Sequence, residues 1–267
     1  METFSLLTLN SFGAPGMGAR PRLRALAQEI NDAGYSMVCL QEVQAHRYRL
    51  LLTDACRDCY PEYAYKHFVH APKGGLLTLS RLVIIRSEFV LFRERGLWYT
   101  PAITDGILLK GILVTHARLG DVPIVVMNTH LTANYTGDWS ANSLFARQEQ
   151  RELQQIAELV NAQPESALVL VCGDFNIPRG SWMYSSLLAH TGLCDPLEGD
   201  TRPTFRPHRG MGRHYAAPID FTLYRAPESL KLRFESRLRF EQPILIGGRK
   251  QHLSDHLGVE LCLSWDS

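Results

Sequence analysis

The sequence predicts an α/β fold in which two packed β-sheets carry helices on their outer faces. Segments typical of strands outnumber helical segments, and several strands follow one another with no helical crossover, which does not fit a purely parallel sheet. The helical segments are amphipathic, as expected of helices that cover a sheet. No repeat, low-complexity tract or linker divides the chain, so one domain over residues 1–267 is the simplest count.

The first half of the chain alternates strands and helices. Apolar residues at i, i+3, i+4 and i+7 spacing indicate helices, and alternating or short continuous apolar runs indicate strands. The predicted strands cover Phe4–Asn10, Met37–Glu42 and Leu76–Arg86, and the predicted helices cover Arg20–Ala33 and 44–57.

The second half begins with a predicted antiparallel pair, Ile107–Thr115 and Val122–Thr129, joined near Gly120. An amphipathic helix over Leu144–Asn161 separates this pair from a buried strand. The remaining predicted elements are the strand 169–177, a helix near 182–190, an Arg/His/Gly-rich loop over 206–216, and the strands Ile219–Tyr224 and Leu257–Leu263.

Composition limits the class of protein. With 45% hydrophobic and 21% charged residues the chain is an ordinary globular protein, and a net charge of +1 gives no overall basic surface for nucleic acid. The six cysteines are expected to be reduced, and Cys56 and Cys59 follow a helical pattern that does not fit a thioredoxin-like site. Residues 1–20 do not resemble a signal peptide and no apolar run approaches a membrane span, so we expect the protein to be cytoplasmic or peripheral to a membrane. We also expect a monomer.

The run from Val169 to Ile177 is the most informative stretch. A buried strand ends at Gly173, and period-two geometry places Asp174 and Asn176 on the same side of the extended chain. A carboxylate beside a carboxamide can hold a hard cation or a phosphate oxygen. Because Gly, Asp and Asn also favour turns, a simple strand-to-loop turn stays open at this point.

Polar side chains stand at six strand ends or starts, and together they form a donor set of carboxylates, amides and imidazoles. Such a set suits Mg²⁺ or Mn²⁺, whereas structural zinc would call for cysteines. The sequence contains no nucleophile elbow and no Walker-type Gly-Lys-Ser/Thr, so attack by a metal-assisted water is the simplest mechanism. The residues are Asn10, Glu42, His130, Asp174 with Asn176, Asp220, and Asp255 with His256.

Six short motifs in this order resemble the endonuclease/exonuclease/phosphatase superfamily. The resemblance implies a DNase I-like fold, a four-layer α/β sandwich of two packed mixed or antiparallel β-sheets flanked by helices. It also implies Mg²⁺-dependent cleavage of a phosphoester. The motifs are Thr8-Leu9-Asn10, Gln41-Glu42, Asn128-Thr129-His130, Gly173-Asp174-Phe175-Asn176, Ile219-Asp220 and Ser254-Asp255-His256.

The same resemblance implies a role for each residue. Glu42 would be the main metal ligand, with Asn10 near the same ion and Asp255 completing the acidic cluster. His256 would take a proton from the attacking water, and Asp220 would orient its imidazole. The remaining three would act on the phosphoryl group: Asp174 and Asn176 would position the water and a phosphoryl oxygen, and His130 would donate to the non-bridging oxygens.

Within the superfamily the chain looks like the neutral sphingomyelinase, phospholipase-C-like branch. Gly74–Arg81 resembles its Gly-rich entry into a strand, and Asp105 with Lys110 resembles an aspartate–lysine pair that meets the substrate phosphate. The lysine could instead protect a sheet edge. The implied substrate is a phospholipid or another phosphodiester, and the apolar segments 96–101 and 243–248 could touch a membrane or belong to the core.

Two other functions stay open. A nuclease of the same superfamily could use a local cationic loop to contact a nucleic-acid backbone, and Arg213 in this loop could equally contact a lipid phosphate. A non-catalytic binding module on the same fold would normally lack one of the expected ligands, and here every position is filled. The loop contains Arg202, Arg206, His208, Arg209, Arg213 and His214.

Overall fold

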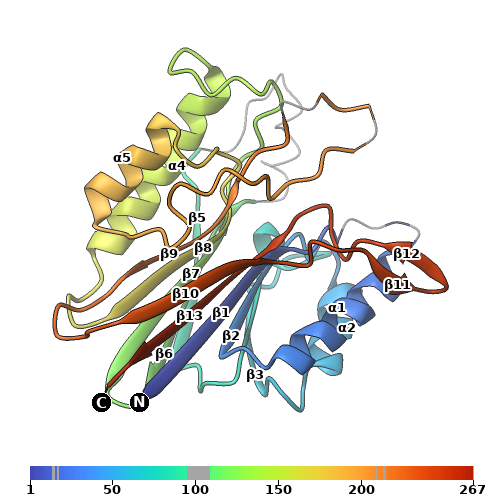
Figure 1. Ribbon diagram of the computed structural model, residues 1–267, viewed down its shortest axis with the longest axis horizontal. Coiled ribbons are helices and arrows are strands. Elements are labelled where there is room, and N and C mark those ends of the chain that lie inside the picture. The colour runs from blue at the N-terminus through green and yellow to red at the C-terminus, as the bar shows by residue number, and fades with distance from the viewer. Residues whose placement is uncertain (14–15, 17, 95–108, 209, 213–214, 267) are drawn as a thin grey trace.

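The computed structural model describes residues 1–267 except 14–15, 17, 95–108, 209, 213–214 and 267. Four helices are described, and they lie in two pairs on opposite sides of the molecule (Figure 1). The helices are α1 (Ala19–Ala33), α2 (His46–Ala55), α4 (Leu144–Asn161) and α5 (Trp182–Thr191).

The strands form two sheets, as the sequence predicts. The first sheet has the order β10-β13-β1-β2-β4-β3, and its strands are β1 (Glu2–Asn10), β2 (Met37–Gln41), β3 (Glu62–Ala64), β4 (Leu77–Ser80), β10 (Arg233–Arg239) and β13 (Gly258–Trp265). The second has the order β5-β6-β7-β8-β9, and its strands are β5 (Arg86–Leu91), β6 (Gly111–Leu119), β7 (Val122–His130), β8 (Leu168–Asp174) and β9 (Asp220–Arg225).

The two sheets pack face to face and each carries one helix pair, which gives four layers. Period-two alternation explains this arrangement. Phe4 and Leu6 of β1 pack between the sheets, whereas Leu7 and Leu9 pack under α1 and α2. In β8 the alternation repeats, with Leu168, Leu170 and Cys172 between the sheets and Val169 and Val171 under α4 and α5. The predicted four-layer α/β sandwich is confirmed.

The predicted strand Leu76–Arg86 was wrong in its extent. β4 ends at Ser80, whose hydroxyl donates to the Leu82 carbonyl and accepts from the Leu82 amide, and the chain then crosses to the other sheet. β5 begins only at Arg86. The apolar run therefore covers β4 and the crossover 81–85, which is as apolar as a strand, and it reaches only the first residue of β5.

The predicted antiparallel pair is confirmed with shifted bounds. β6 and β7 pair through a tight turn at Gly120, whose φ of 55° lies in the left-handed region that favours glycine. Residues 107–108 of the prediction lie outside the described part of the chain.

β3, nearly all of β5, β10 and a short hairpin lie outside the predicted strands. β10 has the sequence RFESRLR and lies at the edge of its sheet, where charged residues are tolerated and hide the strand pattern. The apolar segment 243–248 lies in a hairpin of β11 (Ile244–Ile246) and β12 (Arg249–Gln251). Leu245 is 72% exposed and Ile246 is buried, so this hairpin is partly core and partly surface; segment 96–101 lies outside the described residues.

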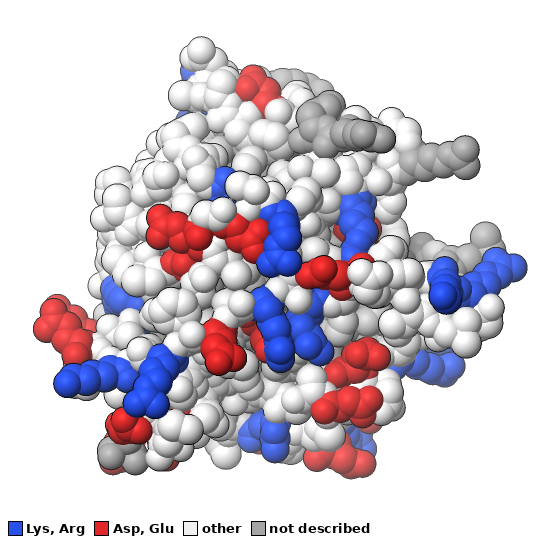
Figure 2. Space-filling model, viewed as in Figure 1, with Lys and Arg blue, Asp and Glu red and all other residues white. Residues whose placement is uncertain are grey.

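Three further findings concern the expectations from composition. All six cysteines are free thiols, and burial, followed by the proximity of Cys59, raises the pKa of Cys56 to about 12, which leaves it unreactive. Lysine, arginine and acidic side chains are interspersed on the face that Figure 2 shows, without a continuous basic band. In the described part of the chain, none of the helices combines the length and the apolar character that crossing a bilayer requires.

Candidate active site

The predicted site residues meet where strands of both sheets end at one edge. β1 and β2 run parallel with Asn10 opposite Gln41, and β7 and β8 run parallel with His130 opposite Asp174. β9 runs antiparallel to β8, so its first residue, Asp220, pairs with Asp174. The carboxyl ends of parallel strands lie together, and an antiparallel neighbour begins there. Side chains far apart in sequence therefore share one location.

Asn10 joins the two sheets across this edge. Its Nδ2 donates to Glu42 Oε1 at 3.1 Å and to Asp174 Oδ2 at 3.0 Å, and its Oδ1 accepts from the Phe12 amide at 3.0 Å. The amide therefore presents its nitrogen to the two carboxylates. In this arrangement Asn10 holds Glu42 and Asp174 near each other, and its oxygen is used by the backbone.

Asp220 and His256 form a buried dyad. His256 Nδ1 lies 2.9 Å from Asp220 Oδ2 and 3.2 Å from Oδ1, and the two residues are 5% and 1% exposed. A carboxylate at Nδ1 requires the proton on that nitrogen, so in the neutral ring Nε2 is the acceptor. Nε2 lies 3.7 Å from Asp174 Oδ2, on the side of the acidic residues.

The electrostatics of the site are strongly perturbed. Burial, followed by the repulsion of Asp220, raises the pKa of Asp174 to about 7, and attraction to His256 opposes this. Burial also raises the pKa of Glu42 from its ordinary value. A cation bound beside the buried Asp174 and the partly buried Glu42 would favour the charged form of both carboxyl groups.

The two histidines are shifted in opposite directions. Burial lowers the pKa of His130 well below its usual value, and the nearby positive charges of Lys110 and His256 lower it further, so His130 is neutral. Burial alone would also lower the pKa of His256, but Asp220 and Asp174 together raise it to about 10. His130 Nε2 lies 3.5 Å from Asp174 Oδ2, so both rings face the same carboxylate.

The backbone at the site adopts conformations that cost energy. Gly173 has a φ of 143°, and a Cβ there would overlap the Thr129 carbonyl oxygen of β7, so only glycine fits. Glu42 and Asn176 have φ values of 56° and 53°, which non-glycine residues rarely adopt. Strained residues of this kind concentrate at functional sites.

The donor set fits a divalent cation. Asp174, Asp220 and His256 each offer a ligand atom, and these atoms lie within 4.8 Å of one another. Asp220 is already engaged by His256 Nδ1, whereas the Glu42 and Asp174 carboxylates are both held by the Asn10 amide. The oxygen donors with raised pKa values, Glu42 and Asp174, are therefore the pair best suited to a hard cation such as Mg²⁺.

Asp255 lies beside this cluster and faces a different partner. Its Oδ2 is 3.0 Å from Nε2 of His208, and its Oδ1 accepts from the Ser254 hydroxyl at 3.2 Å. It is near enough to Glu42 and His256 to influence both pKa values. The predicted metal ligands therefore do not all point at one position.

Lys110 and Asn176 both reach the loop after β7. Lys110 is 6% exposed, and its Nζ donates to the Leu131 carbonyl at 2.6 Å. Asn176 Nδ2 donates to the same carbonyl at 2.9 Å, and its backbone amide donates to Asp174 Oδ1. Both side chains border the site from within the fold; Asp105 and Arg213 lie outside the described residues.

The cationic loop of the sequence is only partly available for a ligand. Arg202 pairs with Asp200 and Glu241, and Arg206 donates to four backbone carbonyls. His208, with 52% of its side chain exposed, pairs with Asp255. Arg209, Arg213 and His214 lie outside the described part of the chain.

Sequence reasoning missed a second buried acidic pair next to the site. Glu149 and Glu152, one turn apart on α4, are 0% and 2% exposed. Glu152 accepts from the amide and hydroxyl of Thr132, two residues after His130, at 2.9 and 2.6 Å. Burial, followed by the repulsion of Glu152, raises the pKa of Glu149 to about 9. The only sequence signal was two acids on the same helix face as Leu153 and Ile156.

An aromatic cavity of about 250 Å³ opens beside His256. Trp139 forms part of its wall and donates through Nε1 to the Asn176 carbonyl at 3.0 Å. The Phe205 ring lies 4.9 Å from the His256 ring. Other large side chains that line it are Tyr135, Met211, Tyr215 and Ile219. The cavity could not be read from the sequence because its walls come from loops with no periodic pattern.

Two relatives share sequence with most of the chain. The chain is 26% identical over 272 residues to the "Putative neutral sphingomyelinase" of Drosophila melanogaster, and the aligned region covers 96% of this chain and 59% of the relative. It is 25% identical over 220 residues to the "Inositol phosphosphingolipids phospholipase C" of Saccharomyces cerevisiae, covering 73% of this chain and 46% of the relative. The chain thus spans about half the length of these relatives.

Solved structures share the fold. Sphingomyelinase C from Streptomyces griseocarneus superimposes with a TM-score of 0.76 at 22% identity, covering 98% of this chain and 99% of that one. TDP2 from Caenorhabditis elegans superimposes with a TM-score of 0.73 at 19% identity, covering 98% and 75%. At such identities these likenesses establish the fold alone.

The expected family is confirmed by its sequence profile. The match begins in β1 just before Asn10 and ends at His256, so it includes all six motifs and both ends of the constellation. The order of these motifs and the gathering of their side chains at one edge agree with this match. Residues 7–256 match the Endonuclease/Exonuclease/phosphatase family, and the chain belongs to that family.

Proposed function

We propose that this protein is a Mg²⁺-dependent phosphodiesterase of the phospholipase C type, which hydrolyses a phosphosphingolipid and releases its phosphorylated headgroup. The observation that carries the proposal is the chain of contacts Glu42–Asn10–Asp174–His256–Asp220, buried except at Glu42, at the edge shared by both sheets. The names of the curated relatives supply the lipid class. Mn²⁺ is an alternative cation with the same preference for oxygen ligands.

Glu42 and Asp174 would hold the cation, and Asn10 keeps these two carboxylates together. When bound, Mg²⁺ supplies positive charge that offsets the charge of the phosphoryl oxygens. Asp255 would add negative charge near this position, since its carboxylate is close enough to raise the pKa of Glu42. These are roles for residues that the fold already brings together.

His256 is the proposed general base. Its Nδ1 is committed to Asp220, so Nε2 is the nitrogen that faces the site and takes a proton from the attacking water. With a pKa near 10 the ring is protonated at neutral pH, and Asp174 is one of the two carboxylates that raise this value. A cation held by Asp174 would offset that carboxylate's charge and so lower the pKa of the imidazole, which would leave Nε2 able to accept a proton.

The remaining polar groups would act on the phosphoryl group. His130 is neutral, so it can donate one hydrogen bond to a non-bridging oxygen as charge builds there. Asn176, held in a strained conformation by Asp174, would position the water or a phosphoryl oxygen. We keep Lys110, Asp105 and Arg213 as proposed substrate contacts, of which Lys110 lies at the inner border of the site.

The aromatic cavity favours a headgroup with a quaternary ammonium. Aromatic faces attract such a cation, and the rings of Tyr135, Trp139, Phe205 and Tyr215 line the space beside His256. Its volume is below the ~300–1,000 Å³ typical of drug-sized ligands, which suits a headgroup better than a whole lipid. Between the two headgroups that the relatives' names suggest, this cavity supports choline over inositol.

Contact with a membrane surface is part of the proposal, because a lipid headgroup lies in one. The β11–β12 hairpin offers exposed Leu245 next to the exposed cations Arg249 and Lys250, a combination that suits a lipid–water interface. We propose a monomer that is cytoplasmic or peripheral to a membrane.

A nuclease is the second candidate. The fold similarity to TDP2 and the exposed His208 are compatible with it. Against it, Arg202 and Arg206 are engaged within the protein, and binding a nucleic-acid backbone depends on free cations. The mixed charge of the face in Figure 2 offers no continuous track for a polynucleotide.

A hydrolysis panel tests the proposal. Sphingomyelin, lysophosphatidylcholine, an inositol phosphosphingolipid, an abasic-site duplex and bis-p-nitrophenyl phosphate are compared with Mg²⁺ and with EDTA. We expect phosphocholine release from sphingomyelin that EDTA abolishes. Preference for the duplex would replace the lipid assignment with the nuclease, and turnover of no substrate would support a binding module.

A further inference from the structure

The loop Leu253–His256, which delivers His256 to the site, has all four of its backbone carbonyls occupied by arginine groups. The Leu253 carbonyl accepts from the Arg22 guanidinium, and those of Ser254 and His256 accept from the Arg206 guanidinium. The Asp255 carbonyl accepts from the backbone amide of Arg206 at 2.7 Å. Loop carbonyls usually face water or irregular partners, so this complete set indicates a purpose-built support.

Arg22 connects this loop to the end of β1. It extends from α1, is 7% exposed, and its Nη1 lies 2.7 Å from both the Ser11 and the Leu253 carbonyl oxygens. Its Nη2 donates to the Phe12 carbonyl. Since Asn10 directly precedes Ser11, Arg22 fixes the His256 loop relative to the residue that holds Glu42 and Asp174.

Arg206 connects the same loop to the end of β10. Nη1 donates to the Ser254 and His256 carbonyls at 3.1 and 3.2 Å, and Nη2 donates to the Phe240 and Glu241 carbonyls at 2.9 and 3.0 Å. A planar guanidinium presents its donors in a fixed fork, so these four contacts define one orientation. A lysine ammonium could not reproduce them.

The segment that carries Arg206 also holds the partner of His256. Thr204, two residues earlier, accepts from the Asp220 amide through Oγ1 at 3.0 Å. Its carbonyl accepts from the Leu257 amide at 2.7 Å. Residues 204–206 therefore contact Asp220 through the Thr204 hydroxyl, and they contact both neighbours of His256, Asp255 and Leu257, through their own backbone.

We propose that Arg22 and Arg206 are positioning residues that set the His256 imidazole against Asp220 and the Asn10–Asp174 pair. Arg206 belongs to the loop that the sequence suggests as a phosphate contact, but its guanidinium is turned inward and used by carbonyls. The proposal rests on the proposed hydrolytic function for its activity readout. A displacement of about 1 Å at a reacting group can cost ~10²-fold in rate, which is the effect expected here.

The test compares Arg206→Ala with Arg202→Ala, because Arg202 lies on the same segment and its guanidinium pairs with the carboxylates of Asp200 and Glu241 at the surface, away from the His256 loop. For Arg206→Ala we expect kcat for sphingomyelin to fall about 100-fold with KM nearly unchanged, and millimolar guanidinium to restore much of it. The downfield proton resonance of His256 Nδ1–H, which reports its bond to Asp220, should weaken in the variant and return with guanidinium. Arg202→Ala should change neither quantity.

Arg206→Lys keeps the charge and the packed stem, so it decides the question if Arg206→Ala does not fold. Loss of kcat and of the resonance in a folded Arg206→Lys protein supports the proposal. The proposal is overturned if a folded Arg206 variant keeps both, or if Arg202→Ala loses as much. Should the wild type turn over no lipid, the proposed function fails, while the resonance still tests the arginine contacts.

Discussion

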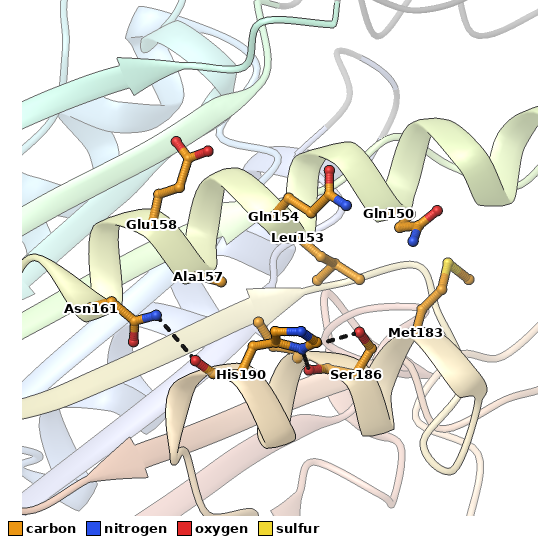
Figure 3. A pocket seen from close by; sticks show the side chains of 10 residues that line it. Gln150, Leu153, Gln154, Ala157, Glu158, Asn161, Met183, Ser186 and His190 are labelled. Carbon is orange, nitrogen blue, oxygen red and sulfur yellow. Dashed lines mark hydrogen bonds between the residues drawn. The ribbon is translucent and has the colours of Figure 1, made fainter.

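Two cavities of similar size differ in what surrounds them. One, of about 250 Å³, opens beside His256. The other, of about 350 Å³, lies between α4 and α5, and Figure 3 shows its lining side chains along the two helices. In this helix groove His190 Nδ1 bonds the Ser186 carbonyl one turn earlier, and Asn161 donates to the His190 carbonyl. Both contacts are exposed, and the first joins residues only four positions apart.

The difference shows that hollow space alone does not indicate function. The cavity at the strand ends borders a dyad whose two residues are 36 positions apart and at most 5% exposed. Removing titratable groups from water costs free energy, and the fold buries four of them at this edge: His130, Asp174, Asp220 and His256. The larger helix groove contains no comparable buried charge among its lining residues. Buried titratable groups that the packing of the fold does not require therefore distinguish a candidate site from a gap between helices.

Substitution at each cavity should give the largest contrast. His256→Ala and Glu42→Ala are expected to fold normally and to lose ~10²–10⁴-fold in kcat, because they remove the proposed base and the proposed metal ligand. His190→Ala in the helix groove should keep wild-type activity. Steady-state kinetics and circular dichroism check this; full activity in His256→Ala or Glu42→Ala would remove that residue from its role.

Stabilisation of the protein by a metal ion should depend on residues at the strand-end cavity and not on residues of the helix groove. At 100 times its Kd, Mg²⁺ should raise the free energy of unfolding by about 2.7 kcal/mol in the wild type and in His190→Ala. Glu42→Gln should lose most of this gain, since it removes a carboxylate without changing shape. Thermal unfolding with Mg²⁺ and with EDTA measures it, and an equal gain in Glu42→Gln would place the ion elsewhere.

The buried acid behind the site should make stability depend on pH. Burial and Glu152 raise the pKa of Glu149 to about 9, so the folded protein keeps a proton that the unfolded chain releases above 4.5. This contribution to the free energy of unfolding is complete below pH 4.5 and is lost as pH rises toward 9. Relative to the wild type, Glu149→Gln should therefore gain up to about 1.4 kcal/mol for each pH unit in this window.

Urea unfolding at pH 5 and at pH 8 checks the Glu149 prediction. Glu158→Gln, on the helix-groove side of α4 and exposed, is the matched control and should show no such trend. A gain that is the same at both pH values would mean that Glu149 is ionised in the folded protein.

The smallest expected effect concerns the aromatic wall. Tyr135→Leu should lower kcat/KM about 2- to 5-fold for p-nitrophenyl phosphocholine, while Tyr135→Phe keeps it, because an exposed ring contributes ~0.5–1 kcal/mol to binding a cation. The uncharged 3,3-dimethylbutyl ester is the control substrate. An equal loss for both esters would mean that Tyr135 contributes packing only.

Much of this arrangement was predictable because it follows strict periodicity. Apolar periodicity identified the four helices and most of the central strands, and strand ends identified Asp174, Asp220 and His130. Expectations failed where pairing overrides local pattern: β10 is a strand despite its charges, because β13 offers it an edge. Leu76–Arg86 holds β4 and the crossover to the other sheet, because the crossover residues are as apolar as those of a strand.

For the candidate site, the sequence predicted which side chains would lie together and not how they are oriented. The residues from Asn10 to His256 gather as expected, but whether Asn10 presents oxygen or nitrogen depends on the Phe12 amide. Arg206 was interpreted as a ligand contact because charge is visible in a sequence and a carbonyl partner 48 or 50 residues away is not. The pairing of Asp255 with His208 is likewise not visible in the sequence, because the two residues are far apart along the chain.

The Asn10 amide bonds one carboxylate in each half of the sandwich, and this has a consequence for how the molecule loses activity. A sliding of the two layers by a fraction of a strand spacing would separate Glu42 from Asp174 while leaving every helix and strand intact. Turnover should therefore disappear before circular dichroism changes during gentle denaturation. Enzymatic rate would then serve as a gauge of interlayer alignment.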